Sequence, residues 1–146
     1  MPEDLLEITR LLSREIPEIA SGAVRIMAAA REPGRQTKVA VTAAAPGVDP
    51  IGVCVGWKGT RVQALQTALG TRVDIHLWSD LPTVMIERAL APGRVVTVET
   101  DSLEHRARVT VRSDQIPRVL GPDGLNRALA TRLTGWAIDI VASDAA

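Results

Sequence analysis

Residues 56–70 read GWKGTRVQALQTALG, and residues 121–135 read GPDGLNRALATRLTG. In each stretch two glycines enclose two residues, and a third glycine ends the stretch. The second stretch lies 65 positions after the first, and the same offset relates Val73-Asp74-Ile75 to Ile138-Asp139-Ile140. The offset of 65 positions is the same from the glycine pair to the last apolar segment. This constant spacing indicates an internal duplication.

The residues around each glycine pair predict helices and strands in a repeated order. Val62, Leu65 and Leu69 follow helical spacing, and apolar residues alternate with polar ones from Val73 to Leu77. The first half is expected to contain a helix over 3–14 that stops near Pro17, strands over 24–28 and 38–42, a short helix over 51–55, a helix over 62–69 and a strand over 73–77. The second half is expected to contain a helix over 83–90, strands over 95–99 and 107–112, a short helix over 116–120, a helix through 128–133 and a strand over 136–141.

This order predicts an α+β protein with two domains, residues 1–79 and residues 80–146. Each domain would have a three-stranded sheet packed by helices. Domains of this size are marginal alone and gain stability from packing together. Only the Ser-Asp-Leu-Pro segment that begins at Ser79 lies between the copies. We therefore expect the two domains to pack rigidly.

The composition is that of an ordinary globular protein, since 46% of the 146 residues are hydrophobic and 23% are charged. No apolar run is long enough to span a membrane, and the acidic start of the chain is unlike a signal peptide. The single cysteine, Cys54, excludes an intramolecular disulfide and a metal site built from several cysteines. It is expected to be a buried, inert thiol. A cytoplasmic location is expected.

The sequence predicts neither an enzyme nor a cofactor. It contains no nucleophile–base constellation and no P-loop, and His76 and His105 have no companions at the spacing of metal ligands. Asp74 and Asp139 occupy equivalent positions in the two copies. This equivalence favours a shared structural or RNA-contacting role over paired catalytic carboxylates. No catalytic residue, metal or cofactor is therefore expected.

Charge is balanced overall, with 17 Lys and Arg residues against 17 Asp and Glu residues. Locally the balance is basic, because the net charge is +3 over residues 31–61 and +4 over residues 106–132. Overall neutrality therefore does not exclude two basic surfaces. Three Trp without any Phe or Tyr are too few for a protein that stacks bases on an aromatic sheet.

A Gly-x-x-Gly loop between two helices is suited to binding phosphate. Glycine has no Cβ atom, so another backbone can approach closely. The helix that follows presents unpaired N–H groups and the positive end of its dipole. In the first loop, Lys58 and Arg61 are expected to add mobile positive charge. KH domains use such a loop to clamp the backbone of about four nucleotides.

Longer motifs resemble the tandem KH domains of the NusA family. Residues 31–34, 38–41 and 48–56, with Gly59 and Arg61, are similar to the first KH domain of that family. Residues 126–130, 133–136 and 138–140 are similar to the end of the second. The resemblance implies the type II KH fold, with the order α-β-β-α-α-β in each domain. It also implies a role in transcription pausing, termination or antitermination through nascent single-stranded RNA. RNA polymerase and other transcription factors are further implied partners.

Bacterial members of this family usually carry a polymerase-binding domain and an OB-fold RNA-binding domain before the KH pair, and this sequence contains neither. It resembles either a short stand-alone member or the KH portion of a longer protein. A second hypothesis is a KH-fold module that docks on RNA polymerase or another factor with little RNA binding. The neutral net charge and the altered second loop favour this alternative.

The second loop departs from the family pattern, which has Lys-Glu between the glycines and Gln-Asn after them. Pro122 removes one N–H donor and Asp123 leaves an acid there, so this loop is expected to bind phosphate more weakly. Trp57 is expected to stack on a base, to contact a partner or to fold against its own domain, whereas Trp136 is expected to be structural. The candidate RNA-binding residues are Gly56, Trp57, Lys58, Gly59, Arg61, Gly121, Pro122, Asp123, Gly124, Asn126 and Arg127.

Overall fold

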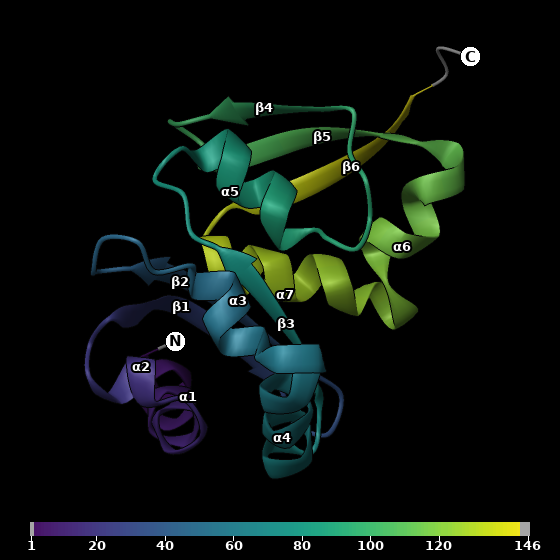
Figure 1. The fold of residues 1–146 in the computed structure, drawn as a ribbon. Helices are drawn as coiled ribbons and strands as arrows, with labels where there is room; N and C mark the ends of the chain where they lie inside the picture. Colours follow the sequence, from purple (N-terminus) through teal and green to yellow (C-terminus); the bar gives the residue numbers. More distant parts are fainter. Residues whose placement is uncertain (1, 144–146) are drawn as a thin grey trace. The chain divides into compact units, whose positions relative to one another are not determined.

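The computed structural model describes residues 2–143, and the chain divides into two compact units between Trp78 and Ser79 (Figure 1). Each unit contains one three-stranded sheet and repeats the same order of helices and strands. Among the described residues, no helix has the length and apolar character needed to cross a membrane.

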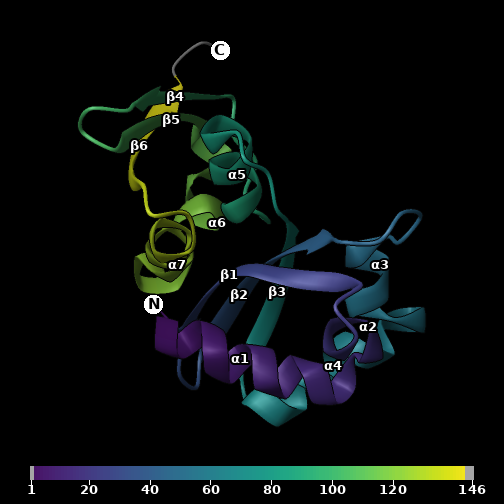
Figure 2. The same cartoon turned by 90° about the vertical axis from the view of Figure 1, so that its left-hand side faces the viewer.

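The first unit has a central strand with one antiparallel and one parallel neighbour. Its elements are α1 (Pro2–Glu15), α2 (Pro17–Ala20), β1 (Val24–Glu32), β2 (Gln36–Ala43), α3 (Pro50–Val55), the 3₁₀ turn η1 (Trp57–Gly59), α4 (Thr60–Leu69) and β3 (Arg72–Leu77). The central strand β2 is antiparallel to β1 and parallel to β3. The helices α1 and α4 lie on the same side of this sheet (Figure 2).

The core of the first unit lies between this side of the sheet and the helices. Ile8, Leu12 and Ile16 are buried at the predicted helical spacing, and Val39 is buried on β2. One helix boundary differs from the prediction, because Pro17 opens the short helix α2 directly after α1. Proline is tolerated at the first position of a helix, where its missing N–H would have no helical acceptor.

The second unit repeats this topology. Its elements are α5 (Pro82–Ala89), β4 (Thr97–Asp101), β5 (Arg106–Arg112), η2 (Ser113–Gln115), α6 (Ile116–Leu120), η3 (Pro122–Gly124), α7 (Leu125–Thr134) and β6 (Ala137–Ser143). The central strand β5 is antiparallel to β4 and parallel to β6. The strand predicted over 95–99 begins later and extends to Asp101, whose carboxylate accepts the N–H groups of Leu103 and Glu104 in the turn.

The second unit also has its own buried hydrophobic residues. They are Met85, Ile86, Ala89, Leu90, Ala107, Val109, Val111, Val119, Leu129, Ala130, Leu133, Trp136 and Ile138. Trp136 stacks on His105 with ring centroids 4.0 Å apart, which confirms its structural role. The predicted α+β fold, with a three-stranded sheet packed by helices in each unit, is confirmed.

Candidate nucleic-acid interface

The two Gly-x-x-Gly loops have nearly the same backbone conformation. In each loop the first glycine, the third residue and the last glycine have positive φ. These angles are 77°, 54° and 74° at Gly56, Lys58 and Gly59, and 73°, 58° and 72° at Gly121, Asp123 and Gly124. The Pro-Asp pair that interrupts the family pattern in the second loop therefore changes its chemistry without changing its backbone.

The first glycine of each loop is required by a close approach as well as by its backbone angles. A Cβ atom on Gly56 would lie 2.7 Å from Cγ of Arg61, and one on Gly121 would lie 2.7 Å from Cβ of Asn126. The last glycine has more room, since a Cβ atom on Gly124 would meet no atom within 4 Å. The first glycine thus fixes how closely the loop approaches the helix that follows.

Trp57 and Lys58 form the exposed tip of the first loop. Trp57 is 77% exposed, so its side chain does not fold against its own domain. The Lys58 ammonium lies 4.6 Å from the centroid of the Trp57 ring, within the range of a cation–π contact. This tip presents a positive charge and an aromatic face to solvent, directly before the N-terminus of α4.

Asn126 is buried and the side chain of Arg61 is about a third exposed, and both side chains contact the helix that precedes their loop. Arg61 Nη1 donates to Glu18 Oε1 at 2.9 Å and to the carbonyl of Val53 at 3.0 Å. In this structure the guanidinium of Arg61 is held by an ion pair and a backbone acceptor, so it is less mobile than the sequence predicts.

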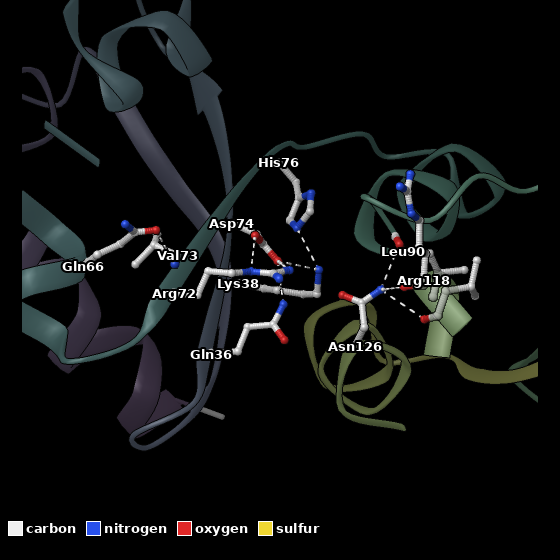
Figure 3. A network of polar contacts seen from close by, with 11 residues as sticks. Gln36, Lys38, Gln66, Arg72, Val73, Asp74, His76, Leu90, Arg118 and Asn126 are labelled. Atoms are coloured by element: carbon white, nitrogen blue, oxygen red, sulfur yellow. Dashed lines mark hydrogen bonds and ion pairs between the residues drawn. The ribbon is translucent and has the colours of Figure 1, made fainter. Parts of the chain in front are cut away.

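Asn126 is 2% exposed, and its amide is enclosed by backbone carbonyls (Figure 3). Asn126 Nδ2 donates to the carbonyls of Leu90 at 2.9 Å, Val119 at 3.0 Å and Arg118 at 3.4 Å. In this geometry its side chain ties the loop to the unit rather than facing a ligand.

The remaining candidates of the second loop are exposed. Pro122 and Asp123 form its tip, and Arg127 lies in the first turn of α7. Arg127 Nη1 donates to the carbonyl of Ile138 at 3.5 Å. Because proline has no N–H, the second loop has one backbone donor fewer than the first.

A buried polar network on the first sheet could not be found from the sequence. Lys38 on β2 is fully buried and lies beside Asp74 on β3, with Nζ 3.2 Å from Asp74 Oδ2 and 3.3 Å from His76 Nε2 (Figure 3). Asp74 Oδ2 also accepts hydrogen bonds from Gln36 at 2.6 Å and from Arg72 at 3.1 Å.

This network shifts the pKa values of its charged members. Burial alone would raise the pKa of Asp74, but Lys38 and Arg72 hold it below its usual range. Burial lowers the pKa of Lys38, and Asp74 opposes this effect.

We expect His76 in this network to make the stability of the protein depend on pH. Burial, and then the Lys38 charge, lower the pKa of His76 from 6.5 to about 4, against the opposing effect of Asp74. A depressed histidine pKa stabilises the folded state above the unfolded pKa, and this contribution is lost as pH falls toward 4. We therefore expect the free energy of unfolding to drop by roughly 2 kcal/mol between pH 8 and pH 5 because of His76.

Urea denaturation at both pH values measures this drop. The variant His76→Gln serves as the control, since it cannot gain the proton and should lose correspondingly less stability. Equal losses in the wild type and in His76→Gln would show that other groups cause the pH dependence.

Cys54 lies on α3, just before the first loop, and is fully buried. Burial raises the pKa of its thiol to about 11, because desolvation outweighs the opposing effect of Arg61. The prediction of a buried thiol is confirmed, and a raised pKa lowers the fraction of reactive thiolate at neutral pH.

Comparisons with known proteins agree with this geometry. Residues 3–78 match the family described as NusA-like first KH domain, and residues 82–146 match the NusA-like second KH domain. The chain is 51% identical over 137 residues to a protein of Thermus thermophilus and 42% identical over 134 residues to a protein of Halalkalibacterium halodurans. Both are named transcription termination/antitermination protein NusA.

The matches cover 93% and 91% of this chain but only 35% of each of those relatives. The chain thus spans about a third of the length of the curated relatives that it matches. A solved structure titled "Crystal structure of APE1850" is similar in fold, with a TM-score of 0.64 and 18% sequence identity, over 94% of this chain and 99% of that chain.

Proposed function

Because this chain belongs to the NusA family and consists of its two tandem KH domains, we propose that it binds single-stranded RNA, with the first Gly-x-x-Gly loop as the principal contact. The observation that supports the proposal is the exposed pair of Trp57 and Lys58 at the tip of a loop that opens a helix. The names of the relatives extend the proposal to transcription termination or antitermination, with RNA polymerase or another transcription factor as a further partner.

The first loop offers two kinds of contact to an RNA strand. The N-terminus of α4 and the Lys58 ammonium both attract phosphate oxygens, because the first N–H groups of a helix are unpaired and Lys58 adds a positive charge two residues before α4 begins. The exposed face of Trp57 can stack on a base, a contact worth about 1–3 kcal/mol per base in proteins that bind single strands. Both contacts are independent of base identity, which suits a clamp on a nascent transcript.

The second loop is proposed to contribute less to RNA binding than the first. It keeps the same backbone, but Asp123 replaces a cation at its tip and Pro122 removes one donor. An acid at this position repels phosphate. Residues Arg118 and Arg127 are exposed nearby and could still attract the strand at longer range.

Exchanging the tip charges of the two loops tests the proposal. Lys58→Asp should weaken RNA binding about tenfold and lower the salt dependence of log K by about 0.7 for each phosphate that the variant no longer neutralises. The fold should tolerate this change, because Asp123 already occupies the equivalent position with φ of 58°. The measurement is fluorescence anisotropy of a labelled single-stranded RNA of about ten nucleotides at two salt concentrations.

The reciprocal variant Asp123→Lys is the matched control, and it should bind RNA as tightly as the wild type or more tightly. Thermal unfolding of both variants checks that neither is misfolded. Equal RNA binding by the wild type and Lys58→Asp would place the RNA surface elsewhere. Failure of the wild type to bind several unrelated RNAs would favour the alternative of a protein-docking module.

A further inference from the structure

We propose that Arg61 is a positioning residue, which together with Glu18 fixes the shape of the first loop and does not itself contact RNA phosphate. This inference rests on the proposed function for its consequence in RNA binding, but its structural part can be tested without RNA. It reassigns a basic side chain that sequence reasoning placed among the phosphate contacts.

The contacts of Arg61 all lie on the protein side of the loop. Its guanidinium reaches Glu18 on α2 and the carbonyl of Val53 near the C-terminus of α3. The last carbonyls of a helix accept no hydrogen bond within it, so this bond supplies a partner for one of them. One side chain thereby joins α2, the end of α3 and the start of α4.

The stem of Arg61 also packs against the loop glycine. The space that a Cβ atom of Gly56 would occupy is filled by Cβ and Cγ of Arg61, at 2.8 and 2.7 Å. Moving this side chain out toward a ligand would uncover Gly56 and leave Glu18 without its ion pair. The cost of both changes favours the observed position over an outward one.

The second loop provides an independent case of the same arrangement. Asn126 stands 65 positions after Arg61, and Arg118 stands 65 positions after Val53. In both loops the side chain two positions after the last glycine donates to the carbonyl at this equivalent position, at 3.0 Å from Arg61 and at 3.4 Å from Asn126. An uncharged amide fills the position in one loop, so the position requires a hydrogen-bond donor and does not require a positive charge.

The charge of Arg61 is in addition largely neutralised by Glu18. The Nη1–Oε1 distance is 2.9 Å, and about a third of each side chain is exposed. A paired charge attracts a phosphate less than a free one does. A loop held in its binding conformation, by contrast, binds more tightly because less freedom is given up on association.

Two substitutions of Arg61 distinguish a role in positioning the loop from a role as a positive charge that binds phosphate. Arg61→Asn removes the charge but keeps an amide donor, as in the second loop. Arg61→Met keeps an unbranched stem but removes every donor. If Arg61 positions the loop, Arg61→Asn should retain RNA affinity within about threefold and keep the salt slope, whereas Arg61→Met should weaken binding about tenfold. If Arg61 binds phosphate, both variants should lose affinity alike and the slope should fall by about 0.7.

The variant Glu18→Gln distinguishes the two roles of Arg61, because they predict different changes in RNA affinity. Removing the carboxylate should strengthen RNA binding if Arg61 acts as a charge, because the guanidinium is then unpaired. It should leave binding unchanged or weaken it if Glu18 holds Arg61 in place. Stronger binding by Glu18→Gln would overturn the proposal.

Amide hydrogen exchange of the RNA-free protein tests the structural part alone. The N–H groups of Gly56 and Gly59 donate to the carbonyls of Gly52 and Gly56, both at 3.0 Å. Their exchange should accelerate in Arg61→Met and not in Arg61→Asn. This result would stand even if the wild type bound no RNA, so the two proposals can fail separately. Unchanged exchange in Arg61→Met would overturn the positioning role.

Discussion

Replacing Gly121 by alanine is expected to lower the free energy of unfolding by about 3 kcal/mol. The residue has φ of 73° and ψ of 174°, a region of backbone space that is essentially restricted to glycine and costs other residues about 1–3 kcal/mol. The added Cβ atom would also lie 2.8 Å from the backbone nitrogen of Asn126, and overpacking adds about 1–3 kcal/mol. Urea denaturation of the variant and the wild type measures the difference.

Gly124→Ala in the same loop is the matched control. Gly124 has φ of 72° and ψ of 15°, which is the ordinary left-handed region, and its added Cβ atom meets nothing within 4 Å. We expect a loss of only about 1 kcal/mol for this variant. Equal losses of unfolding free energy in Gly121→Ala and Gly124→Ala would show that the close approach of Gly121 to Asn126 does not contribute to the effect.

Asp74→Asn is expected to lower the free energy of unfolding by about 3 kcal/mol, because it removes the anion beside a fully buried lysine. The side chain keeps its shape, so the change isolates the charge. Lys38 must then remain charged after losing the Asp74 carboxylate or give up its proton, and either outcome costs free energy. Equilibrium urea denaturation at pH 7 measures the loss.

The duplicated fold supplies the control for this prediction. Asp139 is the register partner of Arg108, as Asp74 is of Lys38, but it lies on an open surface and pairs with Arg106 at 3.5 Å. Asp139→Asn should therefore cost less than about 1 kcal/mol. Adding Lys38→Met to Asp74→Asn should restore part of the stability, since it removes the buried charge. Comparable losses from the two aspartate variants would contradict the role of burial.

Sequence patterns predicted the order of helices and strands well, because the glycine loops and apolar segments that define this order are determined by residues close together in the chain. The helix spacing of Ile8 and Leu12, the left-handed helix end at Gly70 and the duplicated register all depend on residues close together in the chain. Boundaries were less accurate. Pro17 begins a helix after the predicted stop, and β1 extends to Glu32 because pairing with β2 continues to the turn.

The candidate site was predicted only in part, because side-chain direction depends on contacts between distant residues. The position between two glycines predicted an exposed loop, but it left open whether Trp57 faces solvent or folds against its own domain. The inward direction of Arg61 depends on Glu18, which lies 43 residues earlier in the chain. The partnership of Lys38 with Asp74 depends on the register of two parallel strands, and Lys38 alone resembles any solvated charge in a strand.

The contrasting surroundings of the tryptophans have an optical consequence. Trp57 is exposed at the tip of the first loop, Trp78 is half-buried, and Trp136 is buried against His105. Emission from a solvent-exposed indole lies at longer wavelength than emission from a buried one and is open to dissolved quenchers. A base stacked on Trp57 would shield it and change only the long-wavelength part of the spectrum. The loop proposed to hold RNA therefore carries its own fluorescent reporter, and occupancy can be followed on unlabelled protein and unlabelled RNA.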